Sequence, residues 1–337
     1  MTDRPDPASD PASGPATDPA PASGQATPAT QALKSSADAQ RLGPGRAAAA
    51  LLSGYVIWGL SPLFYKLLAF ASPAEIVLHR AIWSVPLLAI LLVSARRWSA
   101  AVSVLGDKRM LGLLAVTAVL IGANWWTFIF AVNSGQVLEI SLGYYINPLM
   151  NVALGVFIAS ERFGRLRAVA VGLAALGVVN QIVTVGELPI IALFLAVSFA
   201  GYGYLRKTMA VDGRIGLFWE TAIIAVPSLA ILGFVEFGGG GGHFREGWSQ
   251  AALLVLSGAM TVGPLLLFLT GARGLSFAVI GAAQFIAPTL QFCLGLFYGE
   301  VFTPAHAITF ALIWAGLAVF VVDLLLFERK KRQKARS

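Results

Sequence analysis

The chain has 337 residues, of which 57% are hydrophobic and only 12% are charged. Soluble domains carry about 25% charged residues, so this composition cannot cover an ordinary water-facing surface. It indicates a chain whose solvent is lipid, in which every backbone polar group must bond within the protein. The net charge of +7 comes from basic residues in short loops and at the termini, so we expect no nucleic-acid partner.

The N-terminal 46 residues differ from the rest of the chain. They are rich in Pro, Ala, Ser, Thr and Asp and nearly free of large apolar residues. Such a segment cannot bury enough surface to offset chain entropy, so residues 1–46 are predicted to form a disordered cytoplasmic tail. They do not resemble a signal peptide, because no basic start leads into an apolar core.

The remaining sequence consists of apolar segments separated by short polar connections. Apolar runs of this length are typical of membrane-spanning helices. There are ten, at 47–70, 76–94, 110–132, 137–159, 166–184, 188–205, 215–235, 249–271, 276–298 and 305–327. The sequence therefore predicts an all-α polytopic membrane protein, and the even count places both termini on one side of the membrane.

The basic residues indicate which side that is, because cytoplasmic loops of membrane proteins are enriched in Lys and Arg. Most of the basic residues that follow the first apolar segment lie in four stretches, 96–109, 162–167, 206–214 and 328–337. The charged residues of the alternate loops are mostly glutamates. We therefore expect a bacterial inner-membrane protein with cytoplasmic termini, ending in the basic cytoplasmic tail 328–337. The glycine run 238–242 is expected to be external.

The fourth and ninth apolar segments resemble each other. Each has a proline in mid-span, Pro148 or Pro288, and a glutamate at its C-terminal end, Glu161 or Glu300. The chain therefore divides into two five-helix repeats, 47–184 and 188–327. Because five is odd, the second repeat enters the membrane from the opposite face. Such inverted repeats are typical of transporters that work by alternating access.

Several longer motifs carry a family resemblance. They are GYVIWGLSPLFYKLL (54–68), PAEIVLHRAIWS (73–84), VLIGANWWTFIFAVN (119–133), SLGYYINPLMNVALG (141–155), ERF (161–163) and ELPIIALFLAVSFAGYG (187–203). Together they are similar to the EamA family of the drug/metabolite transporter superfamily over about residues 47–327. The resemblance implies ten helices in two five-helix repeats and an inner-membrane permease that acts as an exporter. It implies no particular substrate and no set of site residues.

Amide side chains follow one stripe in each of the two similar segments. Tyr144, Asn147 and Asn151 flank Pro148, while Gln284 and Gln291 flank Pro288. A proline removes one helical hydrogen bond and frees a carbonyl, so we expect both prolines to break their helices and the amides to line a substrate cavity. The alternative is that these amides bond neighbouring helices.

Three further polar and aromatic residues are candidates for the same cavity. Asn124 and Trp125 lie near the middle of the third segment, and Trp58 lies in the first. Tryptophan at that depth can stack against a flat ligand, although ordinary packing between helices explains it equally.

Ionisable residues inside a membrane are costly and usually functional. Glu75 and His79 share a helix face, and Arg80 follows them; with Glu300 they are candidates for an external gate. Glu220 and His79 occupy matching places in the two repeats, thirteen residues after Lys207 and Lys66, and are candidates for proton coupling. The alternatives are snorkelling to the interface for Arg80 and a helix-start acid for Glu220.

The function predicted from these features is secondary transport of a small metabolite or drug across the inner membrane, with proton coupling left open. No catalytic motif is present, so we expect no enzyme activity, no cofactor and no metal site. The expected partners are a small-molecule substrate and the lipid bilayer, and a homodimer is left open. A membrane sensor or regulator without transport activity is the alternative.

Overall fold

The computed structural model describes residues 43–157, 164–186, 188–237, 241–272, 275 and 277–334. The predicted tail 1–46 lies almost wholly outside the described residues, as does Glu161. All regular structure in the described part is helical. The elements are α2 (Pro44–Lys66), α3 (Pro73–Ser94), α4 (Trp98–Ser103), η1 (Val104–Gly106), α5 (Lys108–Asn133), α6 (Val137–Phe157), α7 (Arg165–Val185), α8 (Ile190–Thr208), α9 (Gly213–Phe237), α10 (Trp248–Ala272), α11 (Phe277–Ala283), α12 (Ile286–Phe297) and α13 (Pro304–Lys334).

The predicted polytopic membrane protein is confirmed at this level. Nine spans among the described residues, with α11 and α12 counted as one, are long and apolar enough to cross a membrane. Large apolar side chains such as Val119 and Phe234, 71% and 72% exposed, face outward as lipid contact requires. Helix α6 is not among the nine, although its 21 residues match its neighbours in length.

The two mid-span prolines behave differently. The ninth apolar segment breaks at Gln284 and Phe285, between α11 and α12, because Pro288 has no N–H to donate to the carbonyl of Gln284. Helix α6 instead continues through Pro148 without a break, which corrects the expectation for that residue. The last helix also continues beyond its predicted end to Lys334.

Local sequence explains where several helices begin. Ser72 caps α3: its hydroxyl accepts a hydrogen bond from the Glu75 N–H at 3.1 Å, and Pro73 occupies the first turn, where no donor is lost. Asp107 caps α5 in the same way through the Met110 N–H at 2.9 Å. The caps fix the starts of two helices that carry site residues.

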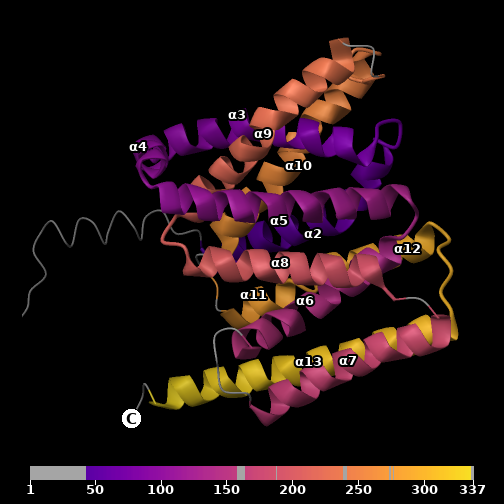
Figure 1. Cartoon of the computed structure of the whole chain (residues 1–337). Coiled ribbons are helices and arrows are strands. Elements are labelled where there is room, and N and C mark those ends of the chain that lie inside the picture. The colour runs from indigo at the N-terminus through magenta and orange to yellow at the C-terminus, as the bar shows by residue number, and fades with distance from the viewer. Residues whose placement is uncertain are drawn as a thin grey trace, which may run out of the picture. The chain divides into compact units, whose positions relative to one another are not determined.

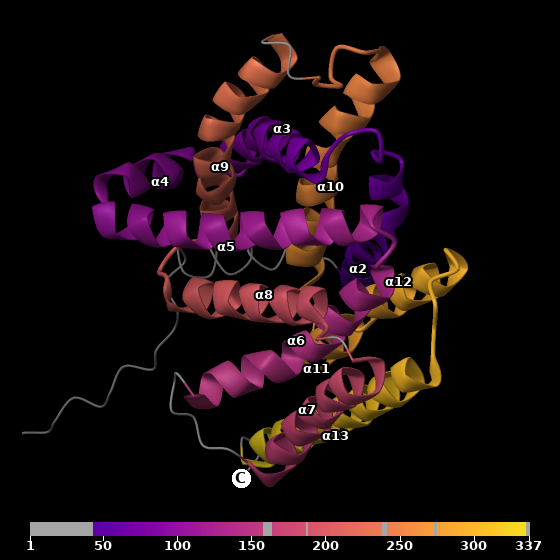
Figure 2. The same cartoon turned by 45° about the vertical axis from the view of Figure 1, so that its right-hand side comes forward.

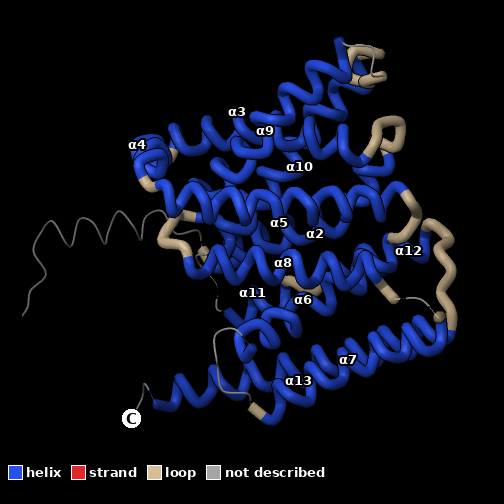
Figure 3. The backbone as a smooth tube through the Cα atoms, viewed as in Figure 1, coloured by secondary structure: helices blue, strands red, loops and turns tan. Residues whose placement is uncertain are grey.

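The connections between helices gather at two ends of the bundle (Figure 3). The α3–α5 and α8–α9 connections lie at the same end as the C-terminal end of α13, and we call this the α8–α9 end (Figures 1 and 2). The α5–α6, α9–α10 and α12–α13 connections lie at the other, the α5–α6 end. Helices α7 and α13 pack together at one edge of the bundle, away from α3 and α9.

Small residues let the central helices approach closely, as is common in membrane bundles. A Cβ atom at Gly54 of α2 would lie 2.9 Å from the Pro264 carbonyl oxygen of α10. A Cβ atom at Gly59 would lie 2.8 Å from a methyl carbon of Leu290 in α12. Helix α2 is thereby held between α10 and α12, and it contributes one wall of the chamber described next.

Candidate functional site: a central chamber

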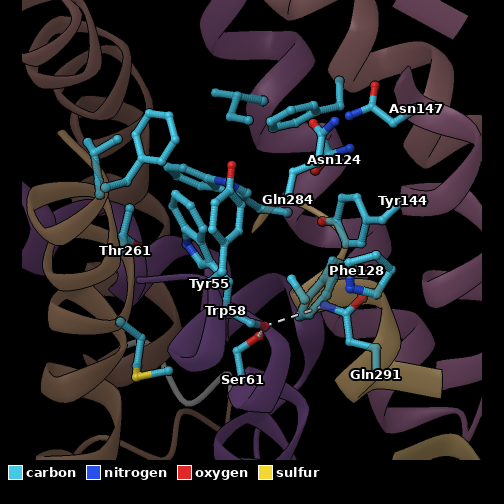
Figure 4. Close-up of a pocket in the computed structure, with 18 of the residues that line it drawn as sticks. Tyr55, Trp58, Ser61, Asn124, Phe128, Tyr144, Asn147, Thr261, Gln284 and Gln291 are labelled. Atoms are coloured by element: carbon cyan, nitrogen blue, oxygen red, sulfur yellow. Dashed lines mark hydrogen bonds between the residues drawn. The ribbon is translucent and has the colours of Figure 1, made fainter. Parts of the chain in front are cut away.

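A chamber of about 390 Å³ lies among the central helices. Its walls come from α2, α3, α5, α6, α8, α9, α10 and α12, and from Gln284 at the break before α12. In Figure 4, Tyr55 and Trp58 lie between Thr261 on one side and Tyr144 on the other. This volume falls within the range of small-molecule binding sites, about 300–1,000 Å³.

The walls are largely aromatic. The aromatic residues are Tyr55, Trp58, Tyr65, Trp125, Phe128, Tyr144, Phe199, Tyr202 and Phe268. Their ring planes meet mostly edge to face or tilted; Tyr65 and Phe128, for example, have centroids 5.9 Å apart at 76°. Rings packed in this way stay fixed and present apolar faces to the chamber, which suits a flat apolar ligand.

Arg80 contributes the one guanidinium among the lining residues, and it is buried. Its Nε donates a hydrogen bond to Thr261 Oγ1 at 2.6 Å, and its Cζ lies 4.2 Å from the Trp125 ring centroid. In the described part of the chain, no carboxylate pairs with it. A cation that is desolvated without a counter-charge is a strong local attraction for an anion.

Seven of the eight residues predicted to line a cavity lie in this chamber: Trp58, Asn124, Trp125, Tyr144, Asn147, Gln284 and Gln291. Asn147 and Gln291 each have a buried side-chain oxygen without a hydrogen-bond partner in the described residues. Asn124 also joins helices, because its amide donates to the Leu195 carbonyl and to Ser198 of α8.

Asn151, the eighth residue, differs from the prediction. It shares a helical stripe with Asn147, but its side chain is exposed and does not line the chamber. One further helical turn moves a residue by about 5.4 Å, which is enough to pass the end of the cavity. Pro148 and Pro288 do line the chamber, and the Pro288 carbonyl accepts a hydrogen bond from Ser141 of α6 at 2.8 Å.

A second hollow of about 420 Å³ lies on the α8–α9 side of the chamber. It shares three lining residues with the chamber, Tyr202, Leu217 and Leu265, and its other walls include Arg206 and Lys207. The shared residues show that the second hollow adjoins the chamber, and its other lining residues extend toward the α8–α9 end with basic side chains among them; we call this hollow the passage.

Glu220 is fully buried beside this passage. Its carboxylate accepts hydrogen bonds from Thr117 Oγ1 at 2.7 Å and from the Tyr202 hydroxyl at 3.0 Å. Arg206 Nε lies 3.7 Å away. The carboxylate is therefore close to two residues of the passage, Tyr202 and Arg206, without lining the passage itself.

Ionisable residues also meet at the α5–α6 end, above the chamber. The Glu75 carboxylate accepts a hydrogen bond from the His243 N–H at 2.9 Å and lies 2.8 Å from ring atom Nδ1 of His243. This carboxylate raises the pKa of His243 above its ordinary value. The His79 ring stacks on Phe244, with centroids 5.0 Å apart. The loop that carries His243 and Phe244 thereby covers this end of α3.

Glu300 does not pair with the basic residues near which the sequence placed it. Its two carboxylate oxygens accept hydrogen bonds from the N–H groups of Val137 and Leu138, at 2.6 and 2.7 Å. These donors open helix α6 and have no partner within the helix, so an acidic side chain is favoured there. Glu300 therefore caps α6 in this structure, and its expected gate role stays a prediction.

Several lining residues escaped the sequence analysis, although helical spacing could have found them. On α2, Tyr55 and Tyr65 lie three and seven residues from the predicted Trp58, on the same helix face. Phe199 and Tyr202 are three apart on α8. Aromatic rings are common in any apolar helix, so they are a weaker sign of a cavity wall than amides and prolines are.

These features define a class before any comparison is made. The protein is a multi-pass membrane protein with a ligand-sized chamber in its centre and a passage to one end. That layout is typical of small-molecule transporters.

Comparison with known proteins identifies the family. Residues 45–180 match the model of the EamA-like transporter family. An uncharacterized transporter of Vibrio cholerae is 44% identical over 81% of this chain and 90% of its own length. Protein RarD of Escherichia coli is 42% identical, over 83% and 95%. The uncharacterized transporter YojE of Bacillus subtilis is 39% identical, over 82% and 94%. The chain belongs to the EamA family of membrane transporters, in the group that includes the RarD proteins.

Proposed function

We propose that this protein is a secondary transporter that carries a small organic anion with a flat apolar body through the central chamber, by alternating access. The observation that carries the proposal is Arg80, a buried cation without a carboxylate partner in the described chain, set in an aromatic wall. A membrane-buried charge of this kind usually serves function rather than stability.

Helix packing supports the ten-helix, inverted-repeat architecture. If α2, α3, α5, α6 and α7 correspond to α8, α9, α10, α11–α12 and α13, exchanging the repeats exchanges the neighbours among the most extensively packed pairs of helices. The α2–α10 contact becomes α8–α5, α2–α12 becomes α8–α6, and α3–α10 becomes α9–α5; all six occur. The pairs α3–α9, α6–α12 and α7–α13 map onto themselves and also occur. We therefore count α6 as the tenth spanning helix.

The two ends of the chamber support alternating access. A passage runs toward the α8–α9 end, while the loop holding His243 and Phe244 covers the α5–α6 end. Basic residues lie in the α3–α5 connection (Arg96 and Arg97) and on either side of the α8–α9 connection (Arg206, Lys207 and Arg214), which favours a cytoplasmic position for the α8–α9 end. On this basis we propose that the structure is the state open toward the cytoplasm and that both termini lie on that side.

We assign proton coupling to Glu220 rather than to His79. The carboxylate faces Tyr202 and Arg206 from α8 and Thr117 from α5. A proton on Glu220 would neutralise its attraction for Arg206, whose side chain lines the passage. Loading and release of that proton would therefore change the charge along the passage, as coupling requires.

A matched ligand screen followed by a transport assay tests the proposal. Full-length protein in detergent is tested for thermal stabilisation by small aromatic compounds, each as carboxylic acid, carboxamide and amine. The acids are expected to stabilise the protein more than the matched amides and amines. The best acid is then tested for counterflow in proteoliposomes. A preference for the amines, or no counterflow with any stabilising acid, would overturn the proposal.

A further inference from the structure

Three ligand-type side chains meet at the α5–α6 end, outside the chamber. They are Glu75 and His79, one turn apart on α3, and Glu236 near the end of α9. One potential ligand atom from each lies within 4.8 Å of those of the other two. Glu75 and His79 are buried, with 6% and 4% of their surfaces exposed.

The cluster contains unused bonding capacity. His79 Nε2 and Glu236 Oε2 are both buried, and neither has a hydrogen-bond partner in the described part of the chain. A buried polar atom without a partner is costly and calls for an explanation, such as an ion. The other oxygen of Glu236 accepts a hydrogen bond from the Phe244 N–H at 3.1 Å, so its carboxylate is already oriented.

The cluster carries an excess of negative charge, which favours binding of a cation. Two carboxylates, Glu75 and Glu236, are opposed by His243, which hydrogen bonds to Glu75. Arg245 donates to the backbone carbonyl of Glu236 rather than to its carboxylate. Carboxylates held this close repel each other, and a divalent ion between them would remove that repulsion.

We propose that Glu75, His79 and Glu236 bind a divalent transition-metal ion, with Zn²⁺ as the best match. Imidazole nitrogen together with carboxylate oxygen is a ligand set that Zn²⁺ uses, whereas Ca²⁺ and Mg²⁺ prefer oxygen alone. Zn²⁺ also binds nitrogen and oxygen ligands more tightly than Mn²⁺ does. A hydrogen bond from His243 to Glu75 is the kind of outer contact that holds a metal-binding carboxylate in place.

Metal binding requires one small change at His79. A neutral imidazole offers one lone pair, so Nδ1 takes the ring proton when Nε2 binds the metal. The Trp83 Nε1–H then loses its contact with Nδ1, which at 3.4 Å is already long. The stacked Phe244 ring keeps the imidazole in place.

The site has a consequence for transport that rests on the proposed function. Two ligands come from α3 and one from α9, so a bound ion ties together the helices that correspond in the two repeats. Opening of the α5–α6 end would have to separate them. Zn²⁺ is therefore expected to inhibit counterflow by holding this end closed.

Calorimetric titration of ZnCl₂ into metal-stripped, full-length protein without a histidine tag tests the site directly. One Zn²⁺ per chain is expected to bind. His79→Gln and Glu236→Gln are each expected to weaken binding by at least about 100-fold, and His243→Gln by about 10-fold. Glu246→Gln, an exposed acid of the same loop, is the matched control and should leave binding unchanged.

The outcomes separate the site from the transport proposal. Absence of saturable binding, or equal affinity in the wild type and Glu236→Gln, would overturn the metal site. If His79→Gln does not give a folded protein, Glu236→Gln alone tests the metal site, because Glu236 is only half-buried and its substitution disturbs folding less. Because the titration does not depend on transport, a protein that binds Zn²⁺ yet fails in counterflow contradicts only the proposed function.

Discussion

The surroundings of Arg80 and Glu220 are built alike and differ in one respect. Arg80 on α3 bonds to a threonine of α10 and lies beside Tyr65 of α2, whose ring centroid is 5.6 Å from its Cζ. Glu220 on α9 bonds to a threonine of α5 and to Tyr202 of α8. Exchanging the proposed repeats exchanges these two helix sets. Glu220, however, has Arg206 at 3.7 Å, whereas no described carboxylate pairs with Arg80.

A buried charge with an opposite partner and one without such a partner suit different functions. A charge with a nearby opposite partner is compensated within the protein and can respond when one partner is neutralised. A charge without such a partner keeps its attraction for an external ligand. We therefore infer that one half of the proposed repeat structure supplies the anion site and the other the coupling site.

Removing the unpaired charge should have the largest effect. Arg80→Gln is expected to lower the affinity for the stabilising acid by about 100-fold or more, roughly 2.7 kcal/mol, because a charge-assisted contact is lost. Arg80→Lys should recover part of this affinity, since lysine restores the positive charge but not the planar guanidinium group, which can donate two parallel hydrogen bonds. Ligand titration by calorimetry gives both values, and equal affinity for the acid in the wild type and Arg80→Gln would contradict the anion site.

Removing the compensated charge should affect coupling rather than binding. Glu220→Gln keeps side-chain size and hydrogen-bonding capacity but cannot take up a proton. Uphill accumulation driven by a pH gradient is expected to fall at least about 10-fold, while exchange at equal pH stays close to wild type. Parallel accumulation and exchange assays in proteoliposomes measure the two. Wild-type accumulation by this variant would exclude Glu220 from coupling.

Both charged regions depend on close helix packing, which can be tested at Gly54. Gly54→Val is expected to destabilise the protein by about 1–3 kcal/mol, because a side chain there meets the α10 backbone. Gly112→Val on α5 is the matched control, since among the described residues a Cβ atom at Gly112 meets nothing within 4 Å beyond its own stretch of helix. Unfolding in mixed micelles compares the two, and equal stabilities would argue against the α2–α10 contact.

The smallest effect is expected from the amides of α6. Asn147→Ala should weaken binding of the acid about fivefold, near 1 kcal/mol, because one neutral hydrogen bond is lost. Asn151→Ala should leave binding unchanged, since Asn151 is exposed outside the chamber. Equal losses in the two variants would show that the α6 stripe acts as a unit, as the sequence alone suggested.

The features that the sequence predicted depend on periodicity and composition. Apolar length locates the helices, and helical spacing places Tyr144 and Asn147 on one face. The break before Pro288 follows from the missing N–H of proline, which is a property of one residue. Such local causes can be seen in sequence, but the unbroken helix at Pro148 shows that they do not decide the outcome alone.

The features that the sequence did not predict depend on contacts between distant segments. Glu300 caps α6, because that helix begins beside it in space rather than in sequence. Glu236 joins Glu75 and His79 only through the packing of α9 on α3. Periodicity cannot place one helix beside another, so these partners required the structure.

Alternating access of the chamber can be measured most directly at Met260, a lining residue to which we assign no role. Met260→Cys is made in a Cys293→Ser background, which removes the chain's one cysteine. A membrane-impermeant thiol reagent is then applied to either face of oriented proteoliposomes. We expect labelling from the cytoplasmic face without substrate, and additional labelling from the opposite face while the acid is being transported. Labelling confined to one face under both conditions would contradict alternating access.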